Sequence, residues 1–71
     1  MVDTNALKNR ICESGMTVVA IAKKSGILRE TLYNRLKSGD FKLSEMCAIV
    51  RVLNLSQSER DAIFFAKDSE L

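Results

Sequence analysis

Side chains that can hydrogen-bond to base edges or phosphates are concentrated in one stretch of this 71-residue chain: Arg29, Glu30, Thr31, Tyr33 and Asn34. Arginine can form two parallel hydrogen bonds to guanine, asparagine can do so to adenine, and glutamate can accept from cytosine. The stretch therefore indicates contact with nucleic acid: base contacts by Arg29, Glu30, Tyr33 and Asn34, and a phosphate contact by Thr31. The plainer alternatives are solvated side chains, a helix-stabilising glutamate, a threonine bonded to its own helix and a tyrosine packed on a neighbouring helix.

Other kinds of chemistry are poorly represented in the chain. It has no histidine, and its two cysteines, Cys12 and Cys47, lie 35 positions apart. A structural zinc site needs about four Cys or His ligands. The sequence also has no Gly-rich phosphate loop and no recognisable catalytic spacing of Ser, Cys, Asp or Glu. We therefore expect no enzyme activity, metal, cofactor or small-molecule ligand, and we expect both cysteines to be reduced core residues.

The charge distribution is more informative than the net charge of +2. Residues 1–42 carry a net +4, whereas residues 43–71 carry a net −2. A basic front half and an acidic back half indicate one surface for a polyanion and another for a different partner. No apolar run is longer than the five residues of 18–22, which is too short for a membrane span or a secretory signal. These features predict a cytoplasmic protein that does not associate with a membrane.

The elements that must position these side chains are helices, because apolar residues recur at spacings of three and four. The pattern predicts a single all-α domain spanning residues 1–71, with helices over 4–14, 18–24, 28–37, 43–53 and 57–66 and a frayed tail over 67–71. The expected core includes Leu7, Ile11, Ile21, Ala22, Ile27, Leu32, Leu36, Phe41, Leu43, Met46, Cys47, Ile49, Val50, Leu53 and Ile63. Ser56 and Glu59 have the spacing of a capping box at the start of the last helix.

Residues 17–37 have the pattern of a helix-turn-helix unit. Ala22 is small enough for close helix contact, and Gly26 suits the turn. In such a unit the second helix enters the major groove and the first crosses above the phosphates. Phosphate contacts are therefore expected from Thr17, at the start of the first helix, and from Lys37 and Lys42, which flank the turn after the second.

Two segments of the sequence carry a family resemblance. The pattern T-x-x-x-I-A-K-K-S-G-I-x-R-x-T-L resembles the lambda-repressor-like helix-turn-helix proteins. The continuation DFKLSEMCAIVRVLNLSQSERDAIFFA resembles small phage-encoded Cro-like repressors of Gram-positive bacteria. The resemblance covers residues 7–66. It implies a compact five-helix domain that binds a palindromic double-stranded operator as a homodimer and represses transcription in a bacterial host.

Some positions depart from this family pattern. Val18 stands where a polar residue is common, Leu28 replaces a capping serine, and Lys42 replaces a capping Ser or Thr. Arg35 occupies a position that is often apolar, so Leu36 is expected to point inward instead. Arg10 lacks the acidic partner that related folds place late in the second motif helix, so its stem is expected to pack on the core.

Phe64 and Phe65 are adjacent, and neighbouring helical residues point about 100° apart. One ring is therefore expected in the core, while the other either is partly covered or anchors a homodimer. The acidic back half and an outward ring also leave a second hypothesis open. The chain could be an antitoxin-like or anti-repressor module that binds another protein and has little affinity for DNA.

Overall fold

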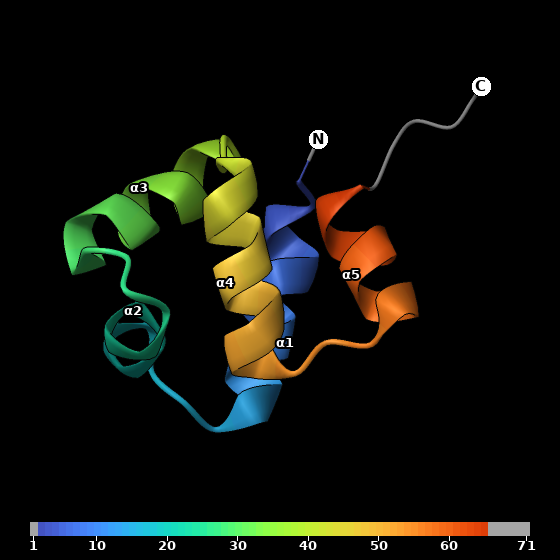
Figure 1. The fold of residues 1–71 in the computed structure, drawn as a ribbon, viewed down its shortest axis with the longest axis horizontal. Helices are drawn as coiled ribbons and strands as arrows, with labels where there is room; N and C mark the ends of the chain where they lie inside the picture. The colour runs from blue at the N-terminus through green and yellow to red at the C-terminus, as the bar shows by residue number, and fades with distance from the viewer. Residues whose placement is uncertain (1, 66–71) are drawn as a thin grey trace.

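The computed structural model describes residues 2–65, which form a compact arrangement of five α-helices without a strand in that range (Figure 1). The helices are Thr4–Ser14 (α1), Val18–Ser25 (α2), Arg29–Ser38 (α3), Leu43–Leu53 (α4) and Gln57–Phe64 (α5). The expected all-α class is therefore confirmed. The expected tail over 67–71, and the expected end of the last helix at Ala66, lie outside the described residues.

Polar side chains define where most of these helices begin. The Asp3 carboxylate accepts from the Ala6 N–H at the start of α1. At the start of α5, Ser56 and Glu59 each accept from the other's backbone N–H, so the expected capping box is confirmed. α3 begins one residue later than expected, because Leu28 is extended and its side chain has no acceptor for the first helical amides.

The core lies where α1 meets α3, α4 and α5 and where α2 meets α3 and α4. Figure 1 shows α4 in front of α1, with α2 and α3 on one side and α5 on the other. The four largest fully buried side chains come from four different helices: Leu7, Ile21, Leu32 and Ile49. The Asp3 N–H donates to the Ile63 carbonyl at 2.7 Å and so ties the beginning of the chain to α5.

The prediction of a buried position is wrong for three residues. Leu43 is 66% exposed, and Cys12 and Cys47 are free and exposed. On α4 the buried face is formed by Ala48, Ile49 and Leu53. Cys47 precedes Ala48 by one residue, so it points about 100° away from that side chain. Ile27, Met46 and Val50 are only partly buried but pack against the core, as expected.

Within residues 2–65, no helix combines the length and the apolar character needed to cross a bilayer.

Candidate nucleic-acid interface

The relative placement of α2 and α3 is set by a short turn and by apolar packing. Gly26 has φ +78°, a left-handed conformation that L side chains rarely adopt, and its N–H donates to the Ala22 carbonyl at 3.0 Å. Ile27 donates to the same carbonyl at 3.2 Å. Ile21 and Ala22 are buried on α2, and Leu32 and Leu36 are buried on α3. α3 is therefore fixed on one side only, and its opposite side faces outward.

The outward side of α3 carries the four residues that the sequence predicts to contact bases. Arg29, Glu30, Tyr33 and Asn34 are all exposed. Within residues 2–65, none of their side chains makes a hydrogen bond to another protein group or an ion pair. The structure thus brings the four together on one helix with their polar groups uncommitted.

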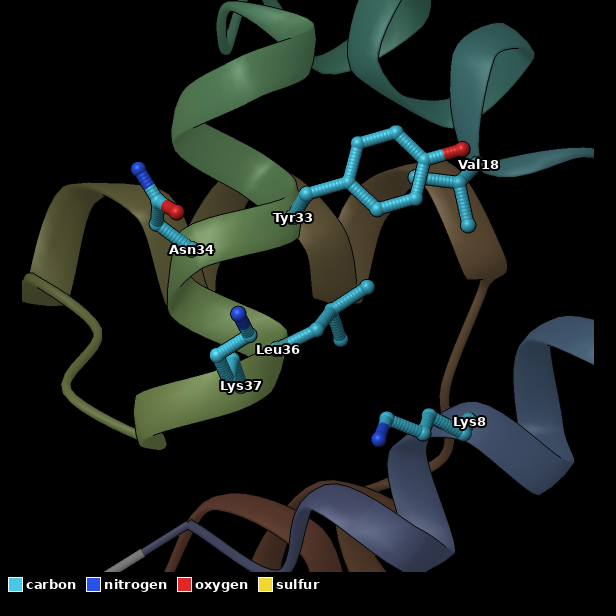
Figure 2. A pocket seen from close by; sticks show the side chains of 6 residues that line it. All are labelled: Lys8, Val18, Tyr33, Asn34, Leu36 and Lys37. Atoms are coloured by element: carbon cyan, nitrogen blue, oxygen red, sulfur yellow. The ribbon is translucent and has the colours of Figure 1, made fainter.

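A hollow of about 500 Å³ lies on one flank of α3, where α1, α2 and α3 meet. We call it the α1 hollow; it is lined by Lys8, Val18, Tyr33, Asn34, Leu36 and Lys37. Figure 2 shows Tyr33 pointing from α3 toward Val18, and Lys8 reaching in from α1. Thr17 adjoins Val18, and its hydroxyl accepts from the Ala20 N–H at 3.0 Å, which confirms it as the cap of α2.

A second hollow, of about 460 Å³, lies between the α2–α3 turn, α3 and α4. We call it the α4 hollow. Its polar and charged lining comprises Ser25, Thr31, Lys42, Ser44, Glu45 and Arg51. The predicted phosphate-contact residues are therefore divided into two groups. Lys37 lies at the α1 hollow and Thr17 adjoins it, whereas Thr31 and Lys42 lie at the α4 hollow.

Arg35 and Glu45 form an ion pair that sequence analysis missed. The Arg35 Nε and Nη2 atoms donate to the two Glu45 carboxylate oxygens at 2.8 and 3.2 Å. The hydrogen bond from Arg35 lowers the pKa of Glu45, although partial burial opposes the shift. The same bond raises the pKa of Arg35. Arg35 therefore connects α3 to α4 instead of taking the apolar role of its position, and Leu36 is buried as expected.

Arg10 forms a second ion pair that the sequence did not reveal. Its Nε donates to Glu59 at 3.3 Å, and its Nη2 donates to the Leu53 carbonyl at 3.2 Å. The pKa of Glu59 is lowered, first by the hydrogen bond from the Ser56 N–H and then by Arg10. The only signal in the sequence was the capping-box position of Glu59, which gave no reason to expect a partner 49 residues away.

The two phenylalanines proposed for a dimer interface differ in exposure. Phe64 is 2% exposed and packs edge-to-face on Phe41, with ring centroids 5.7 Å apart. Phe64 is therefore a core residue and is removed from the predicted interface. Phe65 is 51% exposed. It lines a groove of about 290 Å³ between α4 and α5, together with Leu43, Met46, Cys47, Val50, Arg60 and Phe64.

Comparisons of the chain with protein-family models, with curated proteins and with solved structures find no match. Among residues 2–65, no group of three or more His, Cys, Asp or Glu side chains is arranged to hold a metal ion. The outward side of α3 and the two hollows beside it therefore form the candidate site.

Proposed function

We propose that the chain is a sequence-specific DNA-binding transcriptional regulator whose α2 and α3 act as a helix-turn-helix unit. The observation that carries the proposal is the outward side of α3, where Arg29, Glu30 and Asn34 are exposed and have no side-chain partner among residues 2–65. A major groove about 12 Å wide admits one α-helix. The buried Leu32 and Leu36 hold α3 so that these polar groups can meet base edges.

The two hollows support the same proposal, because both adjoin α3 and each is lined by a lysine. A helix in the major groove has one sugar-phosphate strand on each side. In this proposal Lys37 and Thr17 contact one strand, and Lys42 and Thr31 contact the other; Lys37 lines the α1 hollow, and Lys42 and Thr31 line the α4 hollow. Such contacts set the affinity and orientation of the protein, while the base contacts set its sequence preference.

The proposed active form is a homodimer on a palindromic operator. Two copies of α3 would enter successive major grooves, about 34–36 Å apart or a multiple of that spacing. Phe65 offers an exposed aromatic ring for the contact between copies. The resemblance to Cro-like repressors favours a phage or prophage repressor that acts on DNA in the bacterial cytoplasm.

Selection of bound duplexes from random double-stranded DNA tests this function directly. We expect enrichment of a palindromic motif, which fluorescence anisotropy would show to bind more tightly than a scrambled duplex. Specific sites are typically bound about 10³–10⁷-fold more tightly than non-specific DNA. Recovery of no motif, together with equal affinity for both duplexes, would contradict sequence-specific binding.

A protein-interaction module is the second candidate function. It is favoured by one observation: Leu43 and Phe65, 66% and 51% exposed, line the same apolar groove. This alternative predicts weak DNA affinity and a stable complex with a different protein chain. The DNA selection separates it from the proposed regulator.

A further inference from the structure

Lys8 belongs to the candidate interface, although it lies outside the 17–37 unit. It is on α1, 29 positions before Lys37, and the fold brings the two lysines to the same hollow (Figure 2). Lys8 is exposed and forms no ion pair within residues 2–65. Its helical neighbours three and four positions away are uncharged: Thr4, Asn5, Ile11 and Cys12. Its ammonium group is thus not neutralised by a neighbour on α1.

The chemistry of the α1 hollow matches a sugar-phosphate strand. Val18, Leu36 and the Tyr33 ring give it an apolar wall, and Lys8 and Lys37 give it positive charge. In the described part of the chain, no carboxylate lines this hollow. A phosphodiester strand carries one negative charge per nucleotide and presents a less polar sugar beside each phosphate. Charge complementarity therefore favours this occupant.

We propose that Lys8 is a further DNA-contact residue, which together with Lys37 holds the phosphates of one operator strand along the α1 hollow. The inference rests on the proposed DNA-binding function and extends the contact surface from α2 and α3 to α1. Because phosphates carry no direct sequence information, the contact fixes the register of the protein on DNA and leaves its base preference unchanged.

The test measures how the affinity of the full chain for its selected duplex depends on salt. Lys8→Ala should reduce the slope of log K against log salt by about 0.9 per protomer, and so by about 1.8 for a bound homodimer, because each neutralised phosphate contributes about 0.9. Lys8→Arg should preserve the slope. Lys24→Ala is the matched control, because Lys24 is exposed on α2 and lines neither hollow. Lys8→Ala should also lower the affinity for a scrambled duplex by the same factor as for the selected duplex.

Neutral methylphosphonate substitutions in the duplex locate the contact. One substitution should weaken binding by the wild-type chain but have no further effect on Lys8→Ala. Thermal unfolding checks that Lys8→Ala remains folded, which is expected for a change at an exposed position.

The outcomes separate this inference from the proposed function. Wild-type binding with an unchanged slope in Lys8→Ala overturns the Lys8 contact and leaves the proposed function standing. An equal loss in Lys24→Ala also overturns it, because the effect would then follow from overall charge. A wild-type chain that binds no duplex overturns both.

Discussion

Arg35 on α3 donates two side-chain hydrogen bonds, of 2.8 and 3.2 Å, to Glu45 in the first turn of α4. The same Glu45 carboxylate accepts from the Lys42 N–H at 2.8 Å. Lys42 precedes α4 and has no side-chain oxygen to accept from the first amides of that helix. One carboxylate therefore helps to begin α4 and also fixes α3 against it.

Replacement of Glu45 should destabilise the fold. Glu45→Ala removes both the partner of Arg35 and the acceptor for the Lys42 N–H, and we expect a loss of about 1–2 kcal/mol in the free energy of unfolding. Glu45→Gln keeps an amide oxygen that can still accept, so its loss should be smaller. Urea unfolding of the three chains at neutral pH measures both effects. Equal losses for the two variants would show that the carboxylate oxygen has no role at the start of α4.

The Glu45 ion pair should also make stability depend on pH. The pKa of Glu45 in the folded chain lies below its ordinary value of 4.5, so the unfolded chain binds more protons in the acidic range. The stabilisation is therefore present above pH 4.5 and is lost as the pH falls through the lowered pKa. We expect the stability difference between wild type and Glu45→Gln to shrink over that range. The pKa of Glu59 is also lowered, but Glu59 is present in both chains. Its contribution to pH-dependent stability therefore largely cancels in the difference between them. A difference that stays constant with pH would contradict the pairing.

The helices could be predicted from the sequence, because apolar spacing and capping residues are local signals. Gly26 and the Ser56–Glu59 pair, for example, mark a helix end and a helix start by their own chemistry. The rotation of each helix about its axis is set by packing partners distant in sequence, and local pattern cannot supply it. For this reason Leu43 was misplaced in the core, and the pairing of Arg10 with Glu59 was missed.

The part of the candidate site that lies within residues 17–37 could be predicted from the sequence. Arg29 and Asn34 lie on the outward side of α3, as expected from their places on one helix. Lys8 was missed because it joins the site only through the contact of α1 with α3. The ion pair of Arg35 was missed for the same reason, since its partner lies on a different helix.

Truncation of Leu32 should cost much of the stability of the domain. Leu32 has no exposed surface, and a buried leucine changed to alanine loses about 2–5 kcal/mol. Leu28→Ala is the matched control, because Leu28 immediately precedes α3 and is 76% exposed, so its loss should stay within about 0.5 kcal/mol. Urea unfolding provides the comparison. Similar losses for the two variants would contradict the burial of Leu32 in the core.

Arg29→Ala should relax the base preference of the chain at one position of each operator half-site. A two-bond contact between arginine and guanine contributes about 1–3 kcal/mol of discrimination. Competition between the selected duplex and single-base variants measures this preference. Lys23→Ala is the control, because Lys23 is exposed on α2 and lines neither hollow nor the α4–α5 groove. An equal loss of affinity on every duplex would instead make Arg29 a phosphate contact.

Phe65→Asp should convert the proposed homodimer to a monomer. Phe65 is 51% exposed at the α4–α5 groove, and Phe65→Asp replaces the apolar ring with a charge that must lose its hydration when two copies meet. Val19→Asp is the matched control, because Val19 is apolar, 47% exposed and located on α2. Sedimentation velocity over a range of protein concentrations should show dimers of wild type and Val19→Asp, and monomers of Phe65→Asp. Phe64 is unsuitable for this test, because a change there would disrupt the core. A dimer that survives Phe65→Asp would place the contact between copies on another face.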